Sequence, residues 1–331
     1  MRQAHATRAF FAGALVACIG AVPVCAQEPR WTAEDVSLTT PTGVLFGTIT
    51  RPIALTRYPM VLLIAGSGPT DRNGNTIGAA NGPASLRLLA EGLAARGIAA
   101  LRYDKRSIGA SRSAAVSESA LRFDMLADDA AAWVRQLRTD PRVTSVSIIG
   151  HSEGSLLGML ATQRAPVDAF VSIAGPARRA DLVLHDQLAA ALPPALLAQS
   201  DSALARLAAG DTVTRTPPGL DALFRPSVQP YLISWFRYTP TVELAKLRVP
   251  VLIVQGTHDF QVMPTEATLL AAAVPRATTL VVEGMNHVLK VAPAERSQQI
   301  AGAYVDPTIP LAAPLLDSLV AFVGRAARVR R

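Results

Sequence analysis

The chain has 331 residues, of which 50% are hydrophobic, so it is long and apolar enough to bury a sizeable core as one large α/β domain or two smaller ones. Its formal net charge of +7 is mild for this length, and its basic residues are scattered apart from an arginine-rich tail. Nucleic-acid binding favours a basic face with interleaved aromatic side chains, so we expect no nucleic-acid partner.

The first 26 residues are predicted to be an export signal. Two arginines precede an apolar run at residues 10–22, and Ala26 provides the small residue of a cleavage site. This run is too short for a stable membrane span in the mature protein. We therefore expect a periplasmic or secreted protein. As an alternative, the residues ending at Cys18 resemble a lipoprotein cleavage box, which would leave a lipid on that cysteine.

Both cysteines, Cys18 and Cys25, lie in the predicted signal. Cleavage after Ala26 would leave no thiol, and therefore no disulfide, cysteine nucleophile or thiolate metal site. No group of histidines and carboxylates has the spacing of metal ligands. We expect neither a metal nor another cofactor.

Short apolar segments alternate with helical patterns through the first half of the remaining chain. Strands that are apolar throughout and alternate with helices predict a mostly parallel sheet covered on both faces. The pattern resumes near the C-terminus. A hairpin is predicted at residues 36–49, strands at 60–65, 98–103, 146–149, 169–174, 251–255 and 280–282, and helices at 86–94 and 121–137.

The alternation stops at residue 177. A long Ala/Leu-rich helical region, interrupted by prolines, continues into an aromatic stretch at residues 231–238. Its length and aromatic content favour a lid over the sheet edge, although a set of ordinary connecting helices is the alternative. The predicted organisation is a signal at residues 1–26, a first core part at 27–176, a helical cap at 177–248 and a second core part at 249–331.

Residues 143–161 read as a buried strand, a sharp turn and a helix, with the pattern G-x-S-x-G centred on Ser152. A serine on a strained strand-to-helix turn brings its neighbours so close together that side chains at the two glycine positions would clash. The hydroxyl then projects at the sheet edge, beside a helix N-terminus that favours negative charge. Ser152 is therefore the candidate nucleophile.

A serine hydroxyl needs a general base, and the chain has five histidines. His5 lies in the signal. The His151 side chain is expected to point away from the neighbouring hydroxyl, and His185 lies in the predicted cap. His258 and His287 remain, each in a loop after a predicted strand.

A base also needs a carboxylate that orients it and stabilises its charged form. Asp259 can serve His287 in this way, whereas its neighbour His258 would need a carboxylate from elsewhere. Glu283 is the alternative acid, but its position four residues before His287 is typical of a solvated loop residue. The chain order Ser152, Asp259, His287 is that of hydrolases built on such a sheet.

The oxyanion that forms during acyl transfer needs two fixed N–H donors. The backbone of Glu153 is one expected donor, and a glycine-rich loop supplies the other, with Ser67 as first choice. Gly66 and Gly68 flank that residue and are predicted to contact substrate. The loop could instead be a turn without a ligand, and a phosphate site is disfavoured because no Gly-Lys-Ser/Thr follows.

Three motifs resemble the α/β-hydrolase superfamily: GHSEG around the serine, QG-x-x-D around the aspartate and the Asn-His loop. The segments GSGPTDRNG and RYDKRSIGAS further resemble bacterial serine esterases and acyl hydrolases of the serine-aminopeptidase-like (S33-like) branch. The likeness spans residues 34–325 and implies the α/β-hydrolase fold with an inserted helical cap and the triad above. The chain departs from the family at Ala65, where histidine is frequent, and at Ser107, where glycine is common.

We therefore expect an exported serine hydrolase that cleaves small-molecule carboxylic esters of small or medium acyl groups through an acyl-enzyme. A peptidase or amidase is one alternative, for which Asp181, Asp186 and Asp201 are weak candidates to anchor a substrate amine. The other is a non-catalytic binding protein on the same fold, although binding alone does not need all three triad side chains.

Overall fold

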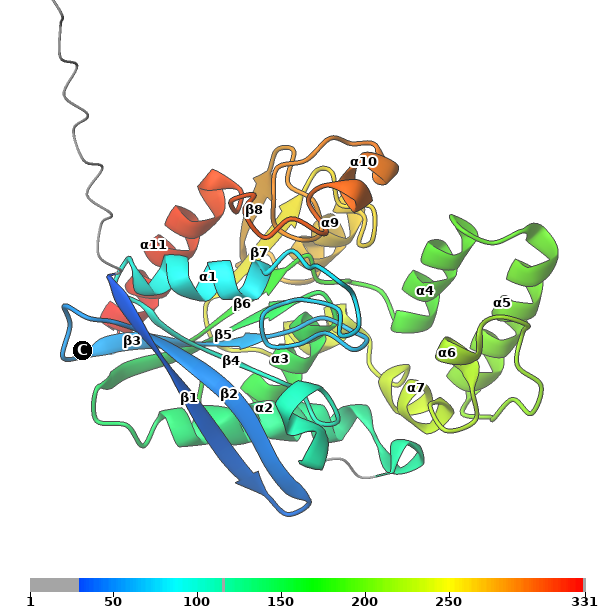
Figure 1. The fold of residues 1–331 in the computed structure, drawn as a ribbon, viewed down its shortest axis with the longest axis horizontal. Coiled ribbons are helices and arrows are strands. Elements are labelled where there is room, and N and C mark those ends of the chain that lie inside the picture. Colours follow the sequence, from blue (N-terminus) through cyan, green and yellow to red (C-terminus); the bar gives the residue numbers. More distant parts are fainter. Residues whose placement is uncertain (1–29, 115–116, 330–331) are drawn as a thin grey trace, which may run out of the picture.

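The computed structural model describes residues 30–114 and 117–329, so the predicted signal and both cysteines lie outside the described residues. One eight-stranded sheet forms the centre of the molecule, in the order β1-β2-β4-β3-β5-β6-β7-β8 (Figure 1). β1 pairs antiparallel with β2, and β2 with β4, while all other neighbours are parallel. The strands are β1 Trp31–Thr40, β2 Gly43–Pro52, β3 Tyr58–Ile64, β4 Ala99–Tyr103, β5 Val143–His151, β6 Ala169–Ile173, β7 Val251–Gly256 and β8 Thr278–Val282.

Side chains of the central strands pack into two separate hydrophobic cores, one on each face of the sheet. In β3, Met60 and Leu62 belong to one apolar cluster, and Val61 and Leu63 to the other. Because successive residues of a strand point to opposite faces, a strand buried on both faces must be apolar throughout. This is why the strands lack alternation in the sequence.

Helices cover both faces of the sheet (Figure 1). α2, α3 and α9 contribute to the first cluster, while α1 and α11 contribute to the second. This arrangement confirms the predicted fold class, a mostly parallel sheet with helices on both faces. The α-helices are α1 Ser85–Ala94, α2 Phe123–Leu137, α3 Glu153–Arg164, α4 Ala180–Ala189, α5 Pro194–Ala209, α6 Asp221–Phe224, α7 Gln229–Trp235, α8 Pro240–Ala245, α9 Pro264–Ala273, α10 Arg296–Ala301 and α11 Ala313–Val329, and the short 3₁₀ segments are Gly109–Ala114 and Glu118–Ala120.

Helices α4 to α8 occupy the chain between β6 and β7, and α4 to α7 lie together to one side of the sheet (Figure 1). Aromatic side chains join them to the core. The ring of Phe123, at the start of α2, stacks on Trp235 of α7 with the ring centroids 5.6 Å apart, and Tyr231 lies against both rings. These inserted helices, called the cap below, are therefore packed against the helix layer of the core. That they form a separate lid, with boundaries at residues 177 and 248, stays a prediction.

Within the part of the chain that the structure describes, no helix has both the length and the apolar composition needed to cross a membrane.

Candidate active site

Ser152 sits between the end of β5 and the start of α3 with a strained backbone, φ 56° and ψ −124°. A positive φ is uncommon for a residue with a side chain and occurs mostly where the surroundings impose it. The surroundings here are very close: a Cβ at Gly154 would lie 2.3 Å from the carbonyl oxygen of Ile64, and one at Gly150 would lie 2.2 Å from the carbonyl oxygen of Gly154. Both glycines of the pattern are thus required by the turn.

His287 and Asp259 lie in the loops after β8 and β7, and their side chains meet. His287 Nδ1 is 2.8 Å from Asp259 Oδ2, and both side chains are buried. Because a carboxylate only accepts hydrogen bonds, the proton of neutral His287 belongs on Nδ1. Nε2 is then left with its lone pair, which is the state that a general base requires.

Asp259 is held in its ionised state. Burial raises its pKa, but His287 and the backbone N–H groups of Val262 and Gln261 more than offset that effect, and the pKa lies below its ordinary value. Those two N–H groups donate to Oδ1 at 2.9 Å each, while Oδ2 faces His287. One carboxylate oxygen is therefore anchored, and the other is aimed at the imidazole.

Ser152 and His287 lie beyond the ends of β5 and β8, which are separated in the sheet by β6 and β7, and hydrogen bonds connect their loops. The Ser152 N–H bonds the carbonyl of Ile173 at the end of β6, and the side chain of the adjacent His151 reaches the backbone of His287. None of the described residues forms a hydrogen bond with the Ser152 hydroxyl. Such bonds are often long in ligand-free enzymes and tighten when substrate binds.

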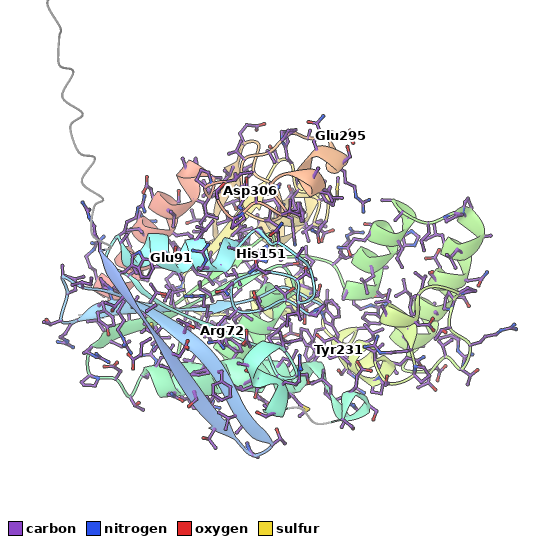
Figure 2. All side chains as sticks on the ribbon, viewed as in Figure 1. Arg72, Glu91, His151, Tyr231, Glu295 and Asp306 are labelled. Carbon is purple, nitrogen blue, oxygen red and sulfur yellow. The ribbon has the colours of Figure 1, made fainter. Side chains whose placement is uncertain are left out.

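His151 has a role that sequence reasoning missed. Its Nε2 lies 2.8 Å from the carbonyl oxygen of His287, and the two imidazole rings are 4.8 Å apart. Figure 2 shows His151 near the centre of the molecule. Burial, together with the neighbouring His287, lowers the pKa of His151 to about 3. The ring is therefore neutral, and since a carbonyl only accepts, its Nε2–H donates to His287 and holds that loop in place.

The predicted oxyanion donors line one small cavity with the serine. Ser67, Ser152 and Glu153 form one side of this cavity of about 30 Å³, and apolar side chains of the cap, including Val183, Leu184 and Trp235, contribute to the other. The backbone N–H groups of Ser67 and Glu153 donate to none of the described residues. Gly66 lies against the serine, since a Cβ there would be 3.1 Å from Ser152 Cβ, whereas a Cβ at Gly68 would meet nothing within 4 Å.

A buried charged network lies behind this cavity, and the sequence did not reveal it. Lys105 follows β4, and its Nζ lies 2.6 Å from the Gly66 carbonyl oxygen and 3.4 Å from Glu153 Oε2. The Tyr231 hydroxyl of α7 donates to the other oxygen of the Glu153 carboxylate. Burial, and then the charge of Glu153, raise the pKa of Tyr231 well above its usual value, so the phenol stays a donor.

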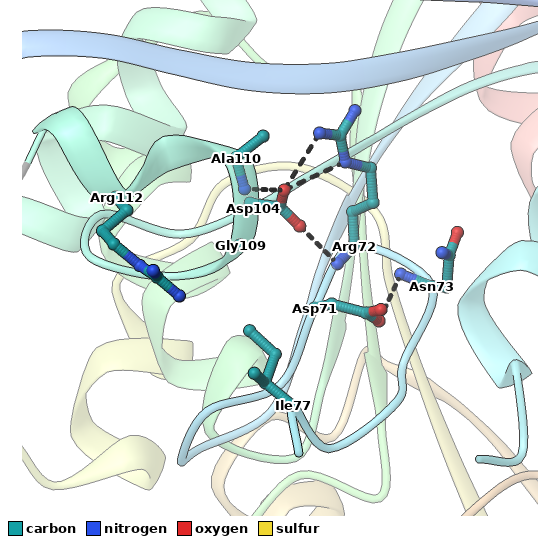
Figure 3. Close-up of a pocket in the computed structure, with 8 residues that line it drawn as sticks. All are labelled: Asp71, Arg72, Asn73, Ile77, Asp104, Gly109, Ala110 and Arg112. Carbon is teal, nitrogen blue, oxygen red and sulfur yellow. Dashed lines mark hydrogen bonds and ion pairs between the residues drawn. The ribbon is translucent and has the colours of Figure 1, made fainter. Parts of the chain in front are cut away.

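The loop that carries Ser67 is fixed further along by Asp104. Figure 3 shows this carboxylate bonded to the backbone N–H of Arg72 at 2.8 Å, to the guanidinium of the same residue and to the N–H of Ala110. These groups line a depression of about 550 Å³. Although this depression is larger than the cavity beside Ser152, it includes no residue of the predicted triad.

The alternative base, the alternative acid and the carboxylates nominated for a peptidase have other partners or are exposed. His258 Nδ1 bonds the carbonyl of Ala292 at 2.7 Å, and Glu283 is exposed. The three cap carboxylates nominated to anchor an amine are each paired with a basic side chain. The pairs are Asp181 with Arg179, Asp186 with Arg178 and Asp201 with His185.

Comparison with known proteins gives the same fold. The chain is 28% identical over 258 residues to esterase EstD of Thermotoga maritima; the match covers 73% of this chain but only 57% of that protein. The crystal structure of the α/β hydrolase GrgF from a Penicillium species superposes with a TM-score of 0.57 at 18% identity, covering 90% of this chain and 99% of that one. Est1E from Butyrivibrio proteoclasticus gives 0.56 at 16% identity, covering 88% and 98%.

A sequence model of the alpha/beta hydrolase family matches residues 61–303, which include the strained serine and the histidine–aspartate pair. The finer S33-like branch stays a prediction. With the eight-stranded sheet, the strand-to-helix turn at Ser152 and this match in agreement, the chain belongs to the alpha/beta hydrolase family.

Proposed function

We propose that the protein is a serine hydrolase that cleaves carboxylic esters through an acyl-enzyme. The observation that carries this proposal is the 2.8 Å contact between His287 Nδ1 and Asp259 Oδ2, made in the same corner of the sheet as the strained Ser152. It supplies a base whose free nitrogen is available to take a proton from an alcohol.

In the proposed reaction, His287 Nε2 takes the proton of Ser152 Oγ as that oxygen attacks the ester carbonyl. The N–H groups of Ser67 and Glu153 stabilise the resulting oxyanion. The tetrahedral intermediate collapses, His287 gives its proton to the leaving alcohol, and the acyl group stays on the serine. Water, deprotonated by the same base, then releases the carboxylic acid and restores the serine.

The cavity walls support a small acyl group. Val183, Leu184 and Trp235 offer no charge to a substrate, so an apolar acyl chain suits them better than a charged one. A volume of about 30 Å³ is close to that of one water molecule in the liquid. Acyl groups from acetyl to butyryl would therefore enter by displacing cap side chains such as Leu184, and longer chains would be disfavoured.

Two observations favour esters over peptides. EstD of Thermotoga maritima, which this chain resembles at 28% identity, is an esterase. A peptidase acting on a free amino terminus needs an unpaired carboxylate near the cavity, and Asp181, Asp186 and Asp201 are all engaged by basic side chains. An amidase would also have to expel a poorer leaving group than an alcohol.

The test uses the purified protein with p-nitrophenyl acetate and butyrate, amino-acid arylamides and a fluorophosphonate probe. We expect ester hydrolysis and labelling at Ser152, and loss of both in Ser152→Ala. Ser297→Ala, which alters an exposed serine in the first turn of α10, is the matched control and should keep both. Full esterase activity in Ser152→Ala would overturn the proposal, and faster turnover of arylamides than of esters would favour the peptidase. Absence of both labelling and hydrolysis in the wild type would favour a binding protein.

We also propose that residues 1–26 direct export and are removed, which their charged and apolar pattern supports. The N-terminal sequence of the protein recovered from the periplasm or medium should begin at Gln27. An N-terminus at a lipid-modified Cys18 would instead select the lipoprotein alternative.

A further inference from the structure

The carbonyl of Gly66 and the N–H of Ser67 belong to one peptide group. In a trans peptide, these two groups point in opposite directions across a rigid plane. The Gly66 carbonyl accepts a hydrogen bond from Lys105 Nζ at 2.6 Å, and Ser67 lines the cavity beside Ser152. Fixing the carbonyl therefore fixes the direction of the N–H, which has no partner among the described residues.

The ammonium group also acts on this peptide electrically. A cation that bonds the carbonyl oxygen draws electron density toward it and leaves the N–H of the same peptide more positive, as in chains of hydrogen bonds that polarise one another. Lys105 is 4% exposed, so solvent does little to weaken this effect. Its charge is balanced by Glu153, whose carboxylate lies 3.4 Å from Nζ and is equally buried.

Glu153 connects the second donor to the same network. Its backbone N–H begins α3 beside Ser152, while its side chain accepts from Lys105 and from Tyr231 of the cap. The residue that carries the second predicted donor is thus linked to the first donor through Lys105 and to α7 through Tyr231. Figure 2 shows Tyr231 on the cap side of the molecule.

We propose that Lys105 is a positioning residue for acyl transfer, which orients and polarises the Gly66–Ser67 peptide as an oxyanion donor, and that Glu153 and Tyr231 hold its ammonium group in place and link this donor to the cap. The inference rests on the proposed function, since it assigns a role in stabilising the oxyanion of that reaction. Lys105 touches no reacting atom and acts through the peptide.

The central experiment replaces Lys105 with Met, which keeps an unbranched side chain, one heavy atom shorter, and removes its charge. Loss of one oxyanion donor typically lowers kcat by about 10²–10³-fold. We expect Lys105→Met to lower kcat for p-nitrophenyl butyrate by about 10²-fold with KM changed less than about threefold, because the peptide acts on the charged intermediate more than on the neutral ester. Tyr231→Phe, which removes one bond to Glu153, should lower kcat by a smaller factor.

Arg106→Met is the matched control. Arg106 is the next residue, is 5% exposed, and also pairs with a buried carboxylate, Asp129, but it bonds to neither Gly66 nor Glu153. It should lose a similar amount of stability in urea unfolding and keep kcat within about threefold. A purely structural role for Lys105 would make the two variants lose activity alike, in proportion to stability.

A second readout separates oxyanion binding from folding. A trifluoromethyl ketone adds to an active-site serine and forms a tetrahedral anion, so its affinity should fall in Lys105→Met by the same factor as kcat and stay near the wild-type value in Arg106→Met. Should Lys105→Met fail to fold, the double variant Lys105→Met/Glu153→Gln removes both buried charges, and the same criteria apply to it.

The outcomes are distinct. A folded Lys105 variant with kcat within threefold of wild type, or with unchanged affinity for the ketone, overturns the inference while Ser152 remains the nucleophile. If the wild type neither hydrolyses esters nor reacts with the fluorophosphonate, the proposed function itself has failed.

Discussion

The contact between His287 and Asp259 predicts a large effect from the replacement of a single heavy atom. In Asp259→Asn the side chain keeps its size, but only one of its two terminal atoms can accept hydrogen bonds. The position of Oδ1 is bonded by the N–H groups of Gln261 and Val262 at 2.9 Å each, so the amide oxygen will stay there. The amide nitrogen then faces His287 Nδ1, which Oδ2 faces at 2.8 Å in the wild type.

Two donors cannot face each other, so His287 must move its proton from Nδ1 to Nε2. The imidazole then presents an N–H toward Ser152 and cannot accept the serine proton. Replacing a triad aspartate with asparagine lowers kcat by about 10⁴-fold, which corresponds to about 5.4 kcal/mol of transition-state stabilisation. KM should change little, because the acyl cavity is untouched.

The assay is steady-state hydrolysis of p-nitrophenyl butyrate, with urea unfolding and circular dichroism to establish folding. Glu283→Gln is the control, since Glu283 is the other carboxylate near the base and is exposed. It should keep kcat within about twofold, as surface substitutions usually have small effects. A folded Asp259→Asn enzyme that retains more than a tenth of wild-type kcat, or a comparable loss in Glu283→Gln, would refute the reasoning.

Three further predictions concern the same site. The pKa of Asp259 lies below its ordinary value in the folded state, so the stability that its ionisation contributes should be fully present above about pH 4 and should decline as pH falls through the lowered pKa. The free energies of urea unfolding of the wild type and of Asp259→Asn should therefore converge in acid, and divergence there would contradict the prediction. His151→Ala should lower kcat by about 10²-fold, because the His287 loop loses its hydrogen bond to the imidazole. The pKa of His151 is about 3, so the pH–rate profile of the wild type above pH 5 should contain no inflection from this residue. A comparison of the wild-type and His151→Ala profiles tests this. Leu184→Ala should widen the acyl cavity and raise kcat/KM for hexanoate relative to acetate by about tenfold; an unchanged chain-length profile would place the acyl group elsewhere.

The sequence predicted the sheet, its helix layers and the meeting of His287 with Asp259 because these follow from local patterns. Apolar runs mark the strands, and the ends of parallel strands meet at one edge, so loops after β5, β7 and β8 had to converge. The glycines around Ser152 were equally predictable, since the turn excludes side chains at their positions.

The buried network behind the cavity was missed because its partners are far apart in the chain. Glu153 lies 48 residues from Lys105 and 78 from Tyr231, and no periodic pattern joins them. One signal was present: Lys105 lies two residues after a buried strand, in a chain whose other basic residues are nearly all arginine. His151 was set aside because its side chain was expected to point away from the serine. The structure shows that it reaches the His287 backbone.

The insertion of α4 to α8 between β6 and β7 separates recognition from chemistry along the chain. The strand and turn that carry Ser152 are complete before the insertion begins, and the strands and loops that carry Asp259 and His287 start after it ends. Hydrogen bonds between β5, β6, β7 and β8, and not the intervening helices, set the spacing of the strands that carry these three residues. The insertion can therefore change during evolution, and with it the substrate that is admitted, while the candidate triad keeps its geometry. A graft of a foreign insertion should succeed best when it retains a phenol able to meet Glu153.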